Sequence, residues 1–225
     1  KMRNAYVQGV WQMVRFLFVR HGQSMSNVNR TFTGQADVPL SELGKKQAED
    51  LRGFLLGHYA IDTIWSSDLL RARQTIEPVA SALGLPVHTD RLLREIFGGE
   101  WEEKTVDEIA FRYPEDYAMW QNDIGLARCT GGESLAEVQQ RGILAVRRIA
   151  EENDGKTVLV ATHAAFLRAM QCYWQGLPLR AMKDIPWVPN ASTTEAEYDG
   201  GSVRIVRLAQ DGYLQGEITR ISKGF

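Results

Sequence analysis

The residues best suited to chemistry are an arginine and a histidine at the end of a short apolar run. Arg20 and His21 follow residues 14–19, VRFLFV. A short apolar run flanked by polar residues predicts a strand buried on both faces. An α/β sheet binds its ligands at the carboxyl ends of its strands, and a guanidinium beside an imidazole nucleophile can handle a phosphate group. For this pair alone, a structural histidine at a strand end is the open alternative.

A second histidine occupies the same kind of position. Residues 156–161, KTVLVA, form another apolar run, which ends in Thr162 and His163. A helical pattern follows at once, from Ala164 to about Gln175. If the two strands are parallel neighbours, their carboxyl ends meet at one edge of the sheet. We therefore expect the two histidines to lie together.

A third element supplies a cation. Residues 62–66 predict a short strand, Ser67 or Asp68 is a suitable N-cap, and apolar residues at helical spacing predict a helix over 68–83. Arg71 falls in the first turn, where the helix dipole disfavours a cation by roughly 0.3–1 kcal/mol. An anion in front of the helix would explain that placement, and a solvated surface arginine is the alternative.

A fourth element supplies a candidate acid. Residues 92–102, LLREIFGGEWE, hold several carboxylates, most of which are typical of an acidic loop. Glu95 differs because apolar neighbours surround it in the sequence, and partial burial would favour its protonated form. Glu95 is therefore the candidate general acid, and Glu133 is the next candidate.

These elements resemble the histidine phosphatase superfamily, in the branch that also holds the cofactor-dependent phosphoglycerate mutases. The resemblance spans about residues 14–210. Five ordered segments carry it: RHGQSMSNVNRTFTGQADVPLSELGKKQA at 20–48, SSDLLRARQT at 66–75, LRE with FG and WE at 93–102, GGES at 131–134 and TH at 162–163.

The resemblance implies a role for each site residue. His21 would attack phosphorus, and Glu95 would protonate the leaving alkoxide and then activate water. The transferring phosphoryl group would be held by Arg20, Asn27, Arg71, His163 and the backbone N–H of Ala164. The substrate itself would contact Gln23, Thr33 and Gly34. Gln23 stands where many relatives carry glutamate, and Ala164 and Ala165 stand where glycine is common, so we expect the helix to begin directly after His163.

Composition limits the function classes. The chain has 225 residues, a formal net charge of -2 and scattered basic residues, so nothing favours nucleic acid as a partner. No apolar stretch approaches the ~20 residues that span a bilayer. The first dozen residues do not resemble a signal peptide, and two cysteines suit a reducing cytoplasm. Its four histidines show no metal-binding spacing, so we expect no metal and no cofactor.

The pattern predicts one α/β domain over residues 1–225. Its fold would be a three-layer α/β/α sandwich with a mostly parallel sheet. Helices are expected near 42–56, 68–83, 105–113, 134–152 and 164–175, and strands near 14–20, 62–66, 86–89, 156–161, 192–198 and 202–209, the last two as a hairpin. An aromatic-rich insertion near 98–133 would lie over the site, either as a lid or as a satellite hydrophobic cluster.

Three functions follow. The first is a metal-independent phosphomonoesterase that forms phosphohistidine and acts on small phosphorylated metabolites. The second is a phosphoglycerate mutase, and the third is a catalytically silent phospho-ligand binding module. The segment between Glu95 and Gly131 is acidic and carries only Lys104, Arg112 and Arg128 as cations, which favours the phosphatase. The natural substrate and the existence of a homodimer are not readable from the sequence.

Overall fold

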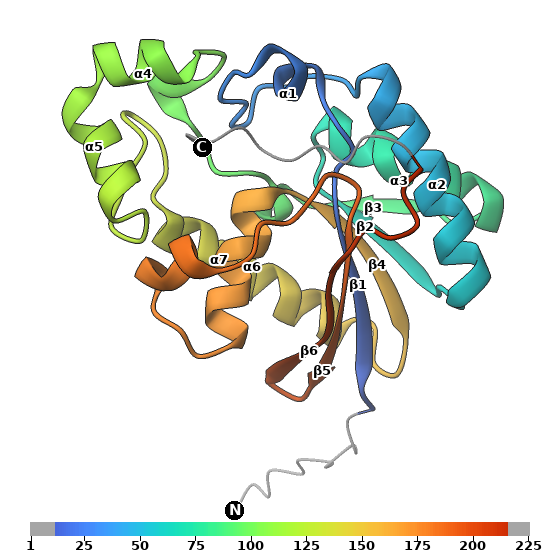
Figure 1. The fold of residues 1–225 in the computed structure, drawn as a ribbon. Helices are drawn as coiled ribbons and strands as arrows, with labels where there is room; N and C mark the ends of the chain where they lie inside the picture. Colours follow the sequence, from blue (N-terminus) through green and yellow to red (C-terminus); the bar gives the residue numbers. More distant parts are fainter. Residues whose placement is uncertain (1–11, 216–225) are drawn as a thin grey trace, which may run out of the picture.

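A six-stranded sheet organises the molecule. The computed structural model describes residues 12–215 (Figure 1). The strand order is β3-β2-β4-β1-β5-β6. The strands are β1 Val14–Arg20, β2 Thr63–Ser66, β3 Val87–Thr89, β4 Thr157–Thr162, β5 Thr193–Asp199 and β6 Ser202–Gln210.

The sheet is mostly parallel, as predicted. The pairs β3–β2, β2–β4 and β4–β1 are parallel. Strand β5 runs antiparallel to β1, and β6 pairs with β5 as the expected hairpin. Because β2, β4 and β1 are parallel neighbours, the segments that follow them begin at one edge of the sheet.

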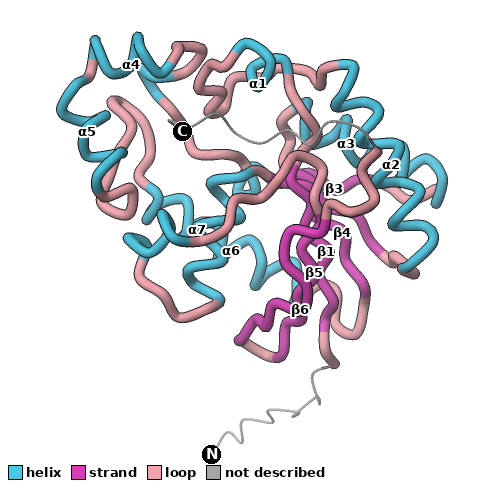
Figure 2. Tube along the Cα trace, viewed as in Figure 1, coloured by secondary structure: helices cyan, strands magenta, loops and turns pink. Residues whose placement is uncertain are grey.

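Helices cover both faces of this sheet, which confirms the three-layer α/β/α sandwich (Figure 2). The helices are α1 Met25–Asn29, α2 Glu42–His58, α3 Leu70–Leu83, α4 Val106–Arg112, α5 Pro114–Asn122, α6 Leu135–Glu151 and α7 Ala164–Trp174, with short 3-10 turns at Arg91–Leu93, Gly99–Trp101 and Leu179–Asp184. Helices α1 and α5 were not predicted. Helix α1 is too short to show a helical period, and α5 begins at a proline directly after α4 ends.

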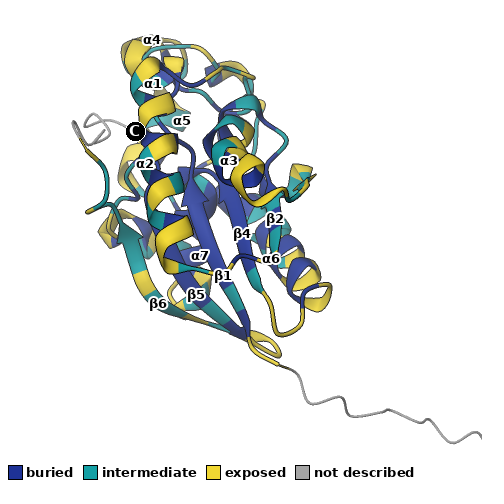
Figure 3. Cartoon of the chain, turned by 90° about the vertical axis from the view of Figure 1, so that its right-hand side faces the viewer, coloured by how far each residue is buried: buried dark blue, intermediate teal, exposed yellow. Residues whose placement is uncertain are grey.

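Alternation along β1 divides the core between the two layers. Phe16 and Phe18 pack with α6 and α7, whereas Leu17 and Val19 pack with α2 and α3. All four side chains are fully buried, and β1 and β4 lie in the interior of the molecule (Figure 3). A strand that is buried on both faces is held rigidly, so the residues at its end are held rigidly too.

The predicted N-cap of α3 is wrong. Helix α3 begins at Leu70, and the N–H of Leu70 donates to the carboxylate of Asp37, at 2.7 Å. Asp68 instead forms a two-pronged ion pair with Arg94, at 2.6 Å for both bonds. A distant carboxylate caps the helix because the loop at residues 33–37 packs against its first turn, and a local pattern holds no trace of that contact.

The insertion near 98–133 extends the main core. Trp101 and Trp120 are buried in the same cluster as the β1 phenylalanines, and both rings contact Phe32 edge-on. Trp101 and Trp120, with the partly buried Tyr113 and Tyr117, therefore belong to the main core and form no satellite cluster, whereas Phe111 is 87% exposed. Movement of this insertion as a lid stays a prediction, as does the single domain over 1–225.

Candidate active site

The parallel register brings His21 and His163 together. Arg20 pairs with Thr162 across β1 and β4, so the next residue of each chain segment is a histidine. The N–H of His21 donates to the carbonyl of Thr162, at 3.0 Å, and the two imidazole rings lie 5.1 Å apart between centroids. The expectation that these histidines meet at one sheet edge is confirmed.

The ring of His21 has one nitrogen occupied and one free for attack. Nδ1 lies 2.7 Å from the carbonyl oxygen of Gly22, and a protonated Nδ1 donates there. The lone pair then lies on Nε2. Burial, followed by the nearby Arg71 and Arg20, lowers the pKa of His21 well below its usual 6.5. The imidazole is therefore neutral near pH 7, which is the nucleophilic form.

His163 is buried with neither ring nitrogen bonded to another group of the protein. Burial is the main cause that lowers its pKa well below 6.5, and Arg71 is the next. A buried polar ring without a partner is costly, so a bound ligand oxygen would relieve that cost.

Two arginines approach the histidines from different elements. Arg20 ends β1 and donates to the carbonyl of Val188, and Arg71 in α3 donates to the carbonyls of Gly34 and Ala36. Burial lowers the pKa of each guanidinium to about 10, and Glu95 opposes that lowering in both. Both therefore stay charged at neutral pH. Within residues 12–215, neither forms a salt bridge with an acid, and each has a buried Nε atom without a partner. Arg71 is not the solvated surface arginine.

The amide of Asn27 is held in one orientation. Its Oδ1 accepts from the N–H and hydroxyl of Ser24, at 3.0 and 3.1 Å, and from Nδ2 of Asn190, at 3.3 Å. Three donors on one oxygen fix which end of the amide is the carbonyl and which is the NH₂ donor, and phosphate contact by that donor stays a prediction. Asn190 is fully buried and also donates to the carbonyl of His21, at 2.9 Å. The sequence analysis missed Asn190.

The carboxylate of Glu95, from a loop, contacts the first turn of α7. Its Oε1 accepts from the backbone N–H groups of Ile96 and Ala165, at 3.0 and 3.1 Å. Helix α7 begins at Ala164, as expected, so the Ala164 N–H is an orphan donor at the first helical position. The surroundings of Glu95 are less apolar than the sequence indicated, because two N–H donors and the field of two arginines reach it.

A network around Arg141 holds the backbone that carries Glu95. Arg141 in α6 donates to the carbonyls of Leu92, Arg94 and Glu95, at 2.6–2.8 Å. The same guanidinium forms a two-pronged pair with Glu133, at 2.9 and 3.0 Å. Glu133 is thus occupied as a carboxylate partner of Arg141, which makes it a poor candidate for the alternative acid. Neither role was visible in the sequence.

The three predicted substrate contacts, Gln23, Thr33 and Gly34, form hydrogen bonds within the loops around the site. The side-chain oxygen of Gln23 accepts from the hydroxyl of Ser41, at 2.6 Å. The carbonyl of Thr33 accepts from the N–H of Ala36 inside a turn, and the carbonyl of Gly34 holds Arg71. Gly34 adopts φ +52, a conformation that glycine takes without strain. The structure gives these three residues roles in holding the site loops, and substrate contact stays a prediction.

A third buried arginine lies near the site. Arg168 in α7 is 6% exposed, stacks on Trp187 with 4.3 Å from Cζ to the ring centroid, and donates to the carbonyl of Met182. Arg20 contacts the same indole, at 5.7 Å. The sequence analysis singled out neither Arg168 nor Trp187.

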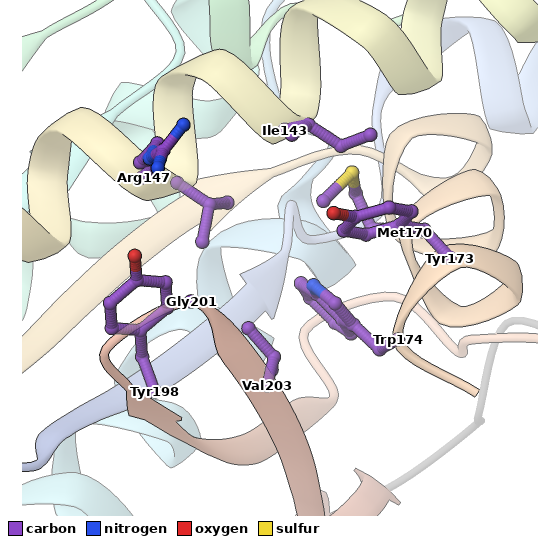
Figure 4. Close-up of a pocket in the computed structure, with 9 residues that line it drawn as sticks. Ile143, Arg147, Met170, Tyr173, Trp174, Tyr198, Gly201 and Val203 are labelled. Atoms are coloured by element: carbon purple, nitrogen blue, oxygen red, sulfur yellow. The ribbon is translucent and has the colours of Figure 1, made fainter. Parts of the chain in front are cut away.

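One hollow in the described structure lies away from these residues. A cavity of about 140 Å³ is lined by residues of α6, α7 and the β5–β6 hairpin, including Ile143, Met170, Trp174 and Val203 (Figure 4). It lies beside Tyr198, which pairs with Val14 at the amino end of β1. The cavity therefore lies near the end of β1 that is opposite the two histidines, and none of the predicted site residues lines it.

The described part of the chain lacks a metal-binding cluster and a membrane-spanning helix. Within residues 12–215, no group of three or more histidine, cysteine, aspartate or glutamate side chains is arranged to hold a metal ion. Over the same range, no helix combines the length and the apolar character that crossing a bilayer requires.

The fold and the site define an α/β enzyme of the phosphate-handling class, with paired histidines and arginines at the carboxyl edge of a parallel sheet. The chain belongs to the histidine phosphatase superfamily (branch 1), whose pattern matches residues 16–211. It is an enzyme of the histidine phosphatase type, and the resemblance stated from the sequence is confirmed.

Individual relatives cover most of the chain. Phosphoserine phosphatase 1 of Hydrogenobacter thermophilus is 35% identical over 167 residues, which are 74% of this chain and 79% of that protein. Glucosyl-3-phosphoglycerate phosphatase of Mycolicibacterium vanbaalenii is 32% identical over 211 residues, 88% of this chain and 92% of that protein. The solved structure of Bacillus stearothermophilus YhfR has a TM-score of 0.86 and 31% identity, and the match covers 90% of this chain and all of that one.

Proposed function

We propose that this protein is a metal-independent phosphomonoesterase that forms a phosphohistidine on His21. The observation that carries the proposal is the neutral His21 ring, with Nδ1 occupied and Nε2 free, beside two buried arginines that form no salt bridge. A phosphomonoester is close to a dianion at neutral pH, and two guanidinium groups match that charge.

The reaction takes two displacement steps. In the first, Nε2 of His21 bonds to phosphorus as the ester P–O bond breaks, and protonated Glu95 gives its proton to the leaving oxygen. In the second, water attacks phosphorus, the N–P bond breaks, and the Glu95 carboxylate takes the proton of the water. Arg20, Arg71 and the neutral His163 hold the equatorial oxygens, where charge is concentrated in the transition state.

Trapping the intermediate tests this proposal. Rapid acid-free quenching with labelled substrate should give a phosphoenzyme that is stable in base and labile in acid. The His21→Ala variant should form none, while the matched control His58→Ala, which removes an exposed histidine far from the site, should trap it normally. Turnover of p-nitrophenyl phosphate should survive excess EDTA. Label on a serine or aspartate, or activity that returns only with zinc or magnesium, would refute the proposal.

The mutase alternative has less support. The segment between Glu95 and Gly131 has three cations, and one of them, Arg128, is already paired with Glu137 at 2.7 Å. We expect 2,3-bisphosphoglycerate not to support rapid interconversion of 3- and 2-phosphoglycerate. Mutase rates well above the hydrolysis rate would reverse this order. The silent binding module is disfavoured because His21 and Glu95 are both present at the site.

The substrates are proposed to be small phosphorylated metabolites. Two relatives, a phosphoserine phosphatase and a glucosyl-3-phosphoglycerate phosphatase, carry names of enzymes of that kind. A cytoplasmic location, the absence of nucleic acid partners and the question of a homodimer stay predictions.

A further inference from the structure

Arg168 is a buried cation that the proposed reaction does not use. It is 6% exposed, and no aspartate or glutamate among the described residues lies within ion-pair distance of it. Its hydrogen bond to the carbonyl of Met182 occupies Nη2, and its Nε is buried without a partner. A buried charge without a counter-ion is costly, and a bound anion would remove that cost.

The position of Arg168 places it beside the phosphate site. It lies four residues after Ala164 in α7, on the same face of the helix and about 6 Å further along the axis. Helical side chains incline toward the amino end of their helix, which in α7 is the end that holds Ala164 and Glu95. Arg20 and Arg168 also contact one indole, that of Trp187.

The neighbours of Arg168 indicate which part of a substrate it would meet. Burial lowers the pKa of Arg168 to about 10, and the Glu95 carboxylate is among the groups that oppose this. Glu95 is the group that would protonate the leaving oxygen, and its Oε1 accepts from the N–H of Ala165, three residues before Arg168 in α7. Residues three apart share one helix face, so Arg168 lies on the leaving-group side of the site. The buried Nε1 of Trp187 is a second donor there without a partner.

We propose that Arg168, stacked on Trp187, binds a second anionic group in the leaving-group part of the substrate. The preferred substrates would then be phosphate esters of small hydroxy acids, with a carboxylate a few bonds from the ester oxygen. This inference rests on the proposed phosphomonoesterase activity and adds a substrate class to it. The rise of about 6 Å along α7 between Ala164 and Arg168 fits the short distance between phosphate and carboxylate in a small hydroxy acid ester, and not the length of a long-chain substrate.

Matched substrate pairs test the proposal. O-phosphoserine and O-phosphoethanolamine differ by one carboxylate, and so do 3-phosphoglycerate and glycerol 3-phosphate, in which a hydroxymethyl group replaces it. The wild-type enzyme should prefer the acid of each pair by at least about tenfold in kcat/KM. The Arg168→Met variant should lose most of that preference, and Arg168→Lys should keep part of it because it retains the charge without the planar fork.

Arg147→Met is the matched control, because Arg147 is an exposed arginine on α6 that pairs with Glu151 and lines the cavity beside Tyr198, away from Glu95 and the two histidines. It should leave every ratio unchanged. A thermal melt of each variant separates loss of fold from loss of recognition, and Arg168→Gln serves as a second variant if Arg168→Met does not fold.

Each other outcome overturns the proposal in a recognisable way. If the wild-type enzyme hydrolyses both members of each pair equally, there is no acid subsite, although the phosphatase activity stands. If Arg168→Met lowers both members by the same factor, Arg168 only supports the site loops. If neither the members of the two pairs nor p-nitrophenyl phosphate yield a phosphohistidine, the proposed function itself fails.

Discussion

Replacing Glu95 with glutamine separates its acid role from its structural role. In the structure, Oε1 accepts from the N–H groups of Ile96 and Ala165, at 3.0 and 3.1 Å, while Oε2 has only a 3.3 Å contact with Ala165. The carbonyl oxygen of glutamine can keep both bonds of Oε1. The variant therefore removes the proton donor and leaves the side chain in place.

The Glu95→Gln change should have a small effect on stability and a large effect on the rate of phosphorylation. Loss of the weak Oε2 contact costs at most about 1 kcal/mol of stability, which shifts the melting temperature by roughly 2–4 °C in a chain of this size. Loss of a general acid slows the phosphorylation step by roughly 10²–10⁴-fold when the leaving group is an alkoxide. That factor is about 3–5 kcal/mol of barrier.

The assay compares two leaving groups in single turnovers. Phosphorylation by glycerol 3-phosphate should show the full loss in Glu95→Gln, because a glycerol alkoxide needs the proton. Phosphorylation by p-nitrophenyl phosphate should lose less than about tenfold, since p-nitrophenolate leaves without one. Its later hydrolysis lacks a base, so p-nitrophenol should appear in a burst while phosphoenzyme accumulates.

Glu133→Gln is the matched control, a carboxylate-to-amide change in the same network that weakens the ion pair with Arg141. This variant should slow phosphorylation by both substrates by a similar factor and produce no burst of p-nitrophenol. Equal losses for both leaving groups in Glu95→Gln itself would refute the acid assignment and leave Glu95 with a structural role.

Three further results are expected. Arg141→Met should lower stability by about 3–5 kcal/mol in urea unfolding, because it leaves the Glu133 charge unpaired, and it should reproduce part of the leaving-group dependence of Glu95→Gln; full activity on glycerol 3-phosphate would contradict the anchoring role. Asn190→Ala should raise the inhibition constant of inorganic phosphate by about tenfold, as expected for one misplaced donor, and an unchanged constant would show that Asn27 needs no support. The fold lowers the pKa values of His21 and His163, so below pH 6.5 the unfolded chain takes up protons that the native chain does not. The free energy of unfolding should therefore fall by about 1.4 kcal/mol per pH unit for each histidine as the pH drops. A free energy of unfolding that does not change between pH 6.5 and 5 in the ligand-free enzyme would contradict the neutral state of the two histidines.

Local patterns were enough to find the histidines and the arginine that the structure brings together at the candidate site. His21 and His163 each follow an apolar run, and Arg71 lies in the first turn of a helix that follows a strand, so a period of two or of 3.6 locates them in the sequence. Most strand and helix ends follow from residues that are neighbours in the chain, and the distant Asp37 cap of α3 is an exception. For the same reason the capping box of α6, in which Ser134 and Glu137 bond reciprocally, is predictable and is present.

The support of the site depends on contacts between distant segments. Asn190 reaches His21 across 169 positions, and Arg141 reaches the backbone of Glu95 across 46. An arginine or asparagine on a helix or loop has the same local pattern whether it faces solvent or a buried carbonyl. Only the packing of the layers decides which, as it does for the Asp37 cap of α3.

The sequence by itself determined the strands, most of the helices and the class of enzyme, because each is encoded in short segments of the chain. The tertiary structure alone decided that β4 lies beside β1, that Glu133 is tied to Arg141, and that Arg168 is buried without a counter-ion. Burial and pairing are properties of the whole packed chain, since the free energy of a charge depends on the groups that surround it in space and not on those beside it in sequence.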